Sequence, residues 1–228
     1  MSLILNIDTA LDTASVCLSE NGNLLQLSCS ENQKDHASWL HTEIAELLQQ
    51  CGYKTHDLAA VAVSIGPGSY TGLRVGLAAA KGFCYALNIP LITVNSLKII
   101  AIAVKSEAIE MICPLIDARR MEVFTALYDK ELREKLSPHA MLVNEKSFAS
   151  CLSQGKVLFC GNGVKKVQPL ISDTNAFFSQ TMAGASQLSQ LSFNCFTNKE
   201  FADLAYTEPL YIKEFYYSAK GNEKKITS

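Results

Sequence analysis

The sequence repeats its opening pattern in its second half, and this repeat restricts the fold more than any other feature. Leu3–Ala10 is an apolar segment that ends in Ile-Asp, and Met111–Ala118 has the same form. After each copy come a turn, a second β-prone segment, a polar turn and a third extended stretch, and Asn21-Gly22 is a strong hairpin signal between two of them. The repeat therefore predicts two sheets built on one plan.

The elements that follow each copy also come in a matching order. In the first half we predict strands at 3–7, 13–18, 24–29, 58–65 and 91–94, and helices at 36–50, at 70–88 and from 96. In the second half we predict strands at 111–117, 122–127, 156–160 and 176–178, and helices near 145–153, 164–170 and 185–193. A duplicated β-β-β-α-β-α unit is typical of the actin-like (ASKHA, ribonuclease-H-like) α/β fold. We place the two domains at 1–104 and 105–228.

Composition excludes several classes of protein. The 228 residues carry a net charge of −2, so we do not expect this chain to bind nucleic acid by itself. The chain has no 18-residue apolar run and no signal peptide, and its eight cysteines form no C-x-x-C pair. We therefore expect a cytoplasmic protein with reduced core thiols and no membrane segment.

A glycine-rich stretch, Ile65–Gly76, lies between a predicted strand and a predicted helix. Ser69 or Thr71 can cap that helix, and a phosphate could bind at such a helix N-terminus. The spacing G-x-G-x-x-x-G is one residue longer than the dinucleotide fingerprint, and the Gly-Lys-Ser/Thr of a P-loop is missing. A nucleotide contact at Asp8, Gly68 and Ser69 is therefore possible, but the stretch can equally be a tight turn.

Asp8 and Asp117 are the candidate catalytic carboxylates, because they end equivalent strands. Such a pair could hold Mg²⁺ with a nucleotide phosphate, which would make the protein an ATPase or kinase. Alternatively, each accepts backbone N–H bonds in its own turn, and Asp12 would repel an anion.

We predict no metal site: His36 and His41 lie about 140° apart around a helix, and H-E-x-x-H is absent. A metallopeptidase is thus the weakest alternative.

The helix at 70–88 is apolar around most of its circumference, so it should be buried on more than one side. Its two charged residues, Arg74 and Lys81, lie on one flank together with Ala78 and Tyr85. In the helix at 36–50, Trp39, the only tryptophan of the chain, lies off the stripe of core residues. Either this chain covers all of these residues, or they bind another protein. The predicted partner-binding residues are Trp39, Leu73, Arg74, Leu77, Ala78, Lys81 and Tyr85.

Four blocks of the sequence resemble the TsaB (YeaZ) family. They are Ile7–Ala10, Gly66–Gly76, Ile116–Val123 and Glu208–Tyr211, and the likeness extends over nearly the whole chain. The resemblance implies an actin-like fold and a non-catalytic subunit. The catalytic relative TsaD carries an H-x-x-x-H metal site, and this sequence has no such pair.

The resemblance also implies the partners. Such a subunit binds TsaD through the helices of its first half and activates it for threonylcarbamoyl transfer to the adenosine next to the anticodon of tRNA. The ATPase TsaE would join the two proteins, ATP or ADP could be shared at the interface, and tRNA would be reached only through the complex. The subunit could also form a homodimer through the same face. The family is often labelled peptidase-like, but no residue here supports proteolysis.

Overall fold

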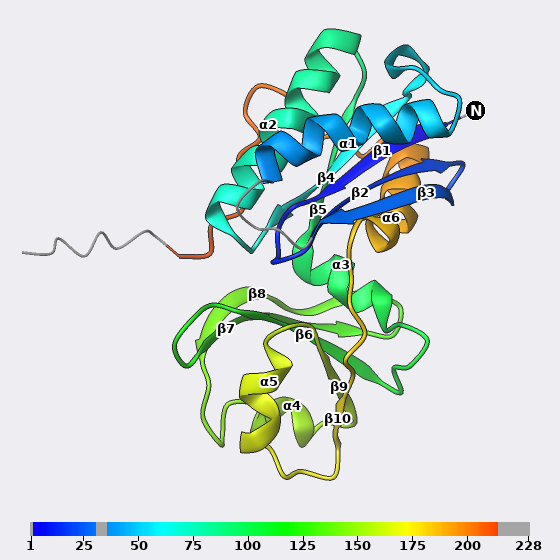
Figure 1. The fold of residues 1–228 in the computed structure, drawn as a ribbon. Coiled ribbons are helices and arrows are strands. Elements are labelled where there is room, and N and C mark those ends of the chain that lie inside the picture. The colour runs from blue at the N-terminus through cyan, green and yellow to red at the C-terminus, as the bar shows by residue number, and fades with distance from the viewer. Residues whose placement is uncertain (1, 31–35, 214–228) are drawn as a thin grey trace, which may run out of the picture.

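The computed structural model describes residues 2–30 and 36–213, and two five-stranded sheets form its framework (Figure 1). The first sheet has the order β3-β2-β1-β4-β5, with β1 Leu3–Asp8, β2 Ala14–Glu20, β3 Asn23–Ser30, β4 Ala60–Gly66 and β5 Leu91–Asn95. The second has the order β10-β9-β6-β7-β8, with β6 Met111–Asp117, β7 Glu122–Asp129, β8 Glu134–Leu142, β9 Val157–Cys160 and β10 Ala176–Phe178. Read in reverse, as β8-β7-β6-β9-β10, the second order matches the first strand for strand, so the duplicated α/β fold is confirmed.

The first sheet is covered by helices on both faces. In each half the opening strand pairs antiparallel with the next strand and parallel with the fourth, so β1 and β6 are central and largely buried. Alternate residues of β1 point to opposite faces. Leu3, Leu5 and Ile7 pack with α1 (His36–Gln50) and α2 (Tyr70–Leu87), whereas Ile4 packs with α6 (Ala185–Asn198).

The second sheet follows the same two-sided plan. Its outer face packs against α4 (Ala149–Leu152) and α5 (Val164–Val167). Its inner face packs against α3 (Ser96–Ala103), which lies between the sheets in Figure 1. Two short 3₁₀ helices, η2 (Thr55–Asp57) and η3 (Gln168–Leu170), complete the described chain. The helix predicted at 145–153 is confined to α4, because an Asn144 turn occupies its first residues.

The last helix does not stay with the second sheet. We expected 105–228 to form one domain, but α6 packs across all five strands of the first sheet. Two hydrogen bonds fix it there: the Ser192 hydroxyl donates to Asn6 Oδ1 at 2.6 Å, and the Ala185 amide donates to Ser15 Oγ at 2.9 Å. A single division at residue 104 therefore separates the sheets but misplaces the C-terminal segment.

None of the described helices is both long enough and apolar enough to span a membrane.

Candidate functional site

The glycine-rich stretch packs tightly against the turn that follows β1. A Cβ atom on Gly68 would lie 2.2 Å from the Ala10 carbonyl oxygen, and one on Gly72 would lie 2.1 Å from the Thr9 carbonyl oxygen. Both distances are far below any real contact, so only glycine allows α2 to begin this close to the sheet. A Cβ on Gly76 would lie 2.3 Å from Thr9 Oγ1. The row of small residues thus serves packing within the chain.

Hydrogen bonds close the same contact. The Ser69 amide donates to the Ala10 carbonyl at 2.7 Å, and the Thr9 hydroxyl donates to the Gly72 carbonyl at 2.7 Å. Ser69 Oγ accepts the Gly72 amide at 3.3 Å, which confirms Ser69 as the cap of α2. These bonds consume part of the N–H set that a phosphate would need at a helix N-terminus.

A cleft of about 900 Å³ lies beside this contact and is lined by both halves of the chain. Gly68 and Ser69 line it, together with Asp117, whose carboxylate is paired with Lys166 Nζ at 2.5 Å. Charges of both signs line the cleft: Asp12, Asp117 and Glu122 against Arg119, Arg120 and Lys213. This balance gives the cleft no strong preference for an anion.

Asp8 does not line the cleft, so the alternative in which Asp8 and Asp117 face one cleft does not hold, and each carboxylate instead accepts an amide of its own turn. Asp8 Oδ1 accepts the Ser64 hydroxyl at 2.7 Å and the Ala10 amide at 3.1 Å, beneath the glycine turn. Burial raises the pKa of Asp8 above its usual 3.8, although these two hydrogen bonds act in the opposite direction. The residues present therefore do not fit a Mg²⁺-nucleotide held jointly by the two carboxylates. Nucleotide contacts at Gly68 and Ser69 stay a prediction.

The raised pKa gives a testable pH dependence. The folded state binds the Asp8 proton more tightly than the unfolded state, so this group lowers the free energy of unfolding as the pH rises above about 3.8. Asp8→Asn keeps an acceptor oxygen for Ser64 and Ala10 but cannot ionise. We expect the variant to be more stable than the wild type at pH 7 and to lose that advantage below pH 4. Urea unfolding between pH 3.5 and 8 checks this, and a constant difference would contradict it.

Much of the exposed surface of α2 is one stripe, which we call the α2 stripe: Arg74, Ala78, Gly82 and Tyr85, which are exposed, and Lys81, which is half-buried. These residues share one face of the helix because they are spaced by three or four positions. Tyr85 is 83% exposed, although it sits on a helix whose other faces are buried. Four of the seven predicted partner-binding residues therefore lie together on the surface.

Two predicted contact residues are not on that surface. The exposed fractions of Leu73 and Leu77 are 1% and 5%, and Leu77 belongs to the core formed by α1, α2 and the first sheet. Their placement on an accessible flank is wrong: α1 and the first sheet cover Leu77, and Leu73 is buried as well. Trp39 is half-buried and packs against the same core, and its contact with a partner stays a prediction.

The C-terminal segment adds residues that the sequence did not single out as contacts. Arg74 Nε donates to the Tyr211 hydroxyl at 2.9 Å, and the Arg74 guanidinium lies 4.0 Å from the centre of the Tyr70 ring. Lys81 Nζ donates to the Ala205 carbonyl at 3.3 Å. The segment thus runs beside the α2 stripe and holds its two cations. The Glu208–Tyr211 block was the only sequence signal for this role.

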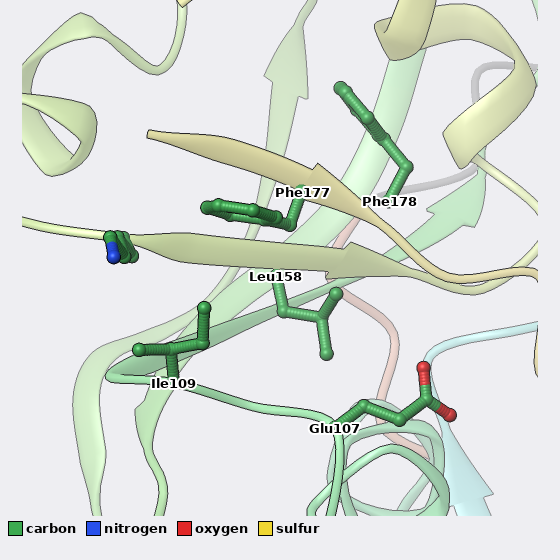
Figure 2. A pocket seen from close by; sticks show the side chains of 6 residues that line it. Glu107, Ile109, Leu158, Phe177 and Phe178 are labelled. Carbon is green, nitrogen blue, oxygen red and sulfur yellow. The ribbon is translucent and has the colours of Figure 1, made fainter. Parts of the chain in front are cut away.

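A second, smaller cavity of about 180 Å³ lies at β9 and β10 (Figure 2). Ile109, Leu158 and Phe177 form its walls, and Glu107, which accepts the Thr181 hydroxyl at 2.9 Å, lies at its edge. This cavity shares no residue with the predicted site.

No three His, Cys, Asp or Glu side chains in residues 2–30 and 36–213 form a group that could hold a metal ion.

Comparison with known proteins decides the family. The sequence model of the tRNA N6-adenosine threonylcarbamoyltransferase family (TsaD) matches residues 29–207. TsaB of Bacillus subtilis, a tRNA threonylcarbamoyladenosine biosynthesis protein, is 29% identical over 97% of this chain and 99% of its own length. The chain belongs to the TsaB (YeaZ) family. TsaB of Escherichia coli is 31% identical over 56% of this chain and 55% of its own length.

Solved structures agree with this TsaB assignment. YeaZ from Pseudomonas aeruginosa superposes with a TM-score of 0.81 at 26% identity, covering 92% of this chain and all of that one. The ROK hexokinase of Thermus thermophilus has a TM-score of 0.52 at 10% identity over 87% of this chain and 99% of its own, which shows a shared fold alone. The expected family and actin-like fold are therefore confirmed, and the family takes part in tRNA threonylcarbamoyladenosine biosynthesis.

Proposed function

We propose that this TsaB is a non-catalytic, cytoplasmic subunit that binds TsaD and activates it for threonylcarbamoyl transfer to tRNA. The observation that carries the proposal is the α2 stripe. A nearly fully exposed tyrosine on the one accessible side of a helix is the kind of residue that anchors protein interfaces. The cations at Arg74 and Lys81 are held in place by the C-terminal segment, so little side-chain freedom would be lost on binding.

The chemistry of the cleft supports an accessory role over an ATPase. Asp8 is buried under the glycine turn, and Asp117 is already paired with Lys166. In this proposal TsaE joins through the TsaD complex, and any ATP or ADP is shared with those partners. In this proposal tRNA is bound by the complex rather than by this chain alone, which agrees with the net charge of −2 on this chain.

The proposal is tested at Tyr85, using TsaD from the same organism. We expect Tyr85→Ala to weaken TsaD binding at least about tenfold, because truncating an interface anchor costs roughly 2 kcal/mol, and to leave the circular dichroism spectrum unchanged. Titration calorimetry measures the affinity, and a tRNA modification assay with TsaD measures activation. Thr55→Ala, in the distant 3₁₀ helix, is the control. Unaltered affinity in Tyr85→Ala would contradict the placement of the interface.

A second measurement separates this proposal from the ATPase alternative. The isolated chain should not hydrolyse ATP in the presence of Mg²⁺. Mg²⁺-dependent turnover that disappears in Asp117→Ala would overturn the accessory role.

A further inference from the structure

The residues after α6 form a strap that crosses the first half of the chain and ends on the second. We call residues 199–213 the C-terminal strap (Figure 1). Its Leu210 amide donates to the Ile65 carbonyl of β4 at 2.8 Å, in the first sheet. Three residues later, Lys213 Nζ forms an ion pair with Glu122 on β7 of the second sheet. The strap is therefore anchored on both sheets, and its last four residues line the cleft.

The first part of the strap is held independently of its end. Asp203 Oδ1 accepts the amides of Ala205 and Tyr206 at 2.8 and 3.0 Å. This turn brings the Ala205 carbonyl to Lys81, whose Nζ donates to it at 3.3 Å. The Leu210 anchor on β4 lies between this turn and the end of the strap. A change at the end of the strap should therefore leave Lys81 in place.

The last three residues of the strap hold Arg74. The Tyr211 hydroxyl accepts Arg74 Nε at 2.9 Å. The Tyr211 ring centre also lies 5.3 Å from that of Tyr70, and the Arg74 guanidinium lies over the Tyr70 ring. Only one residue separates Tyr211 from Lys213, and two residues of chain span at most about 7 Å. A strap end that lifts off β7 therefore pulls Tyr211 away from Arg74.

The ion pair of Lys213 with Glu122 is a weak anchor. Its side chains are 42% and 24% exposed, and ion pairs that reach solvent contribute little to stability. Glu122 itself is fixed, because its carbonyl accepts Lys166 Nζ at 3.2 Å and its strand is paired on both sides. When the pair breaks, the strap rather than β7 is therefore the part that moves.

We propose that the end of the C-terminal strap couples the cleft to Arg74 of the α2 stripe. While Lys213 is bound to Glu122, Tyr211 holds Arg74 in one position. When the pair breaks, Tyr211 leaves and Arg74 is free to take other rotamers. A molecule in the cleft that binds Lys213 or Glu122 thus changes the α2 stripe without touching it. Linkage makes the effect reciprocal, so a partner that binds Arg74 in its held position stabilises the closed strap.

Side-chain NMR of the isolated full chain tests the coupling, and Arg74→Lys identifies the Arg74 signal. In Lys213→Gln we expect the Arg74 Nε–H signal to move toward that of a free arginine side chain. Its proton should exchange with water at least about threefold faster, the size of effect expected when an exposed ion pair is lost. Glu122→Gln should have the same effect, and the double variant should add nothing further.

Two controls show whether the effect is local. Lys165→Gln removes an exposed lysine of α5 in the second half and should leave the Arg74 signal unchanged. In Lys213→Gln the amides of Ala205 and Tyr206 should keep their exchange rates, because their turn lies beyond the Leu210 anchor. An unaltered Arg74 signal in Lys213→Gln would overturn the proposal. Faster exchange at Ala205 and Tyr206 would also overturn it, since the whole strap would then have come loose.

The consequence for TsaD rests on the proposed function. Lys213→Gln should weaken TsaD binding about threefold, because Arg74 must then be ordered on binding. Tyr211→Phe, which keeps the ring but removes the hydroxyl that accepts Arg74, should do the same. If Tyr85→Ala binds TsaD normally, the proposed interface fails and the coupling is decided by the Arg74 signal alone. If Tyr85→Ala binds weakly but Lys213→Gln binds as tightly as the wild type, the interface stands and the coupling is overturned.

Discussion

Replacing Gly72 with alanine should destabilise the protein by about 3 kcal/mol, because the added methyl group would overlap a backbone atom. The new Cβ would lie 2.1 Å from the Thr9 carbonyl oxygen, which belongs to the turn after the central strand β1. Backbone on both sides cannot move without breaking the Thr9–Gly72 hydrogen bond of 2.7 Å. Relief would require α2 to shift away from the first sheet, which would also open the core under Leu77.

The matched control is Gly82→Ala in the same helix. Gly82 is exposed, and a Cβ there would meet no atom within 4 Å. We expect this variant to be more stable than the wild type by about 0.5–1 kcal/mol, because alanine loses less backbone entropy than glycine in a helix. Urea unfolding at pH 7 measures both. Equal effects of the two substitutions would show that the tight contact at Thr9 is not a structural constraint.

The duplicated fold could be predicted because its signals are local. The Ile-Asp strand ends at Asp8 and Asp117 and the Asn21-Gly22 turn depend only on neighbouring residues. Such signals located the strands of both sheets except β8, which was expected only as an extended stretch without bounds. The destination of α6 could not be predicted in this way. It depends on contacts such as that of Ser192 with Asn6, which are 186 positions apart in the chain.

The part of the candidate site that could be predicted is the part with charged residues, because charged side chains usually lie on the surface. Arg74 and Lys81 identified the exposed side of α2, and Ala78 and Tyr85 lie beside them as expected. The apolar residues of the same helix could not be divided between core and interface from their spacing, since a helix buried on several sides has no single apolar stripe. Leu73 and Leu77 were therefore assigned to an accessible surface, although both are buried and Leu77 packs in the core with α1.

Substitutions at two adjacent positions, Leu77→Glu and Ala78→Glu, separate packing in the core from binding of a partner. Leu77→Glu should destabilise the fold by about 4 kcal/mol or more, because it removes a core leucine and buries a carboxylate without a partner. With ordinary domain stabilities of about 5–15 kcal/mol, such a loss would leave only about 1–11 kcal/mol and would disturb the packing of α1 on α2. Loss of TsaD binding in this variant would therefore say nothing about the interface.

Ala78→Glu places the same charge on the exposed α2 stripe, between Arg74 and Tyr85. We expect its urea midpoint to stay close to that of the wild type, because a surface substitution of this kind changes stability by only about 0.5 kcal/mol. Its TsaD binding should nevertheless fall at least about tenfold, since a new carboxylate would be desolvated in the centre of the contact. Normal TsaD affinity in Ala78→Glu would remove the α2 stripe from the interface. A Leu77→Glu variant with the urea midpoint of the wild type would instead show that α1 does not cover this part of α2.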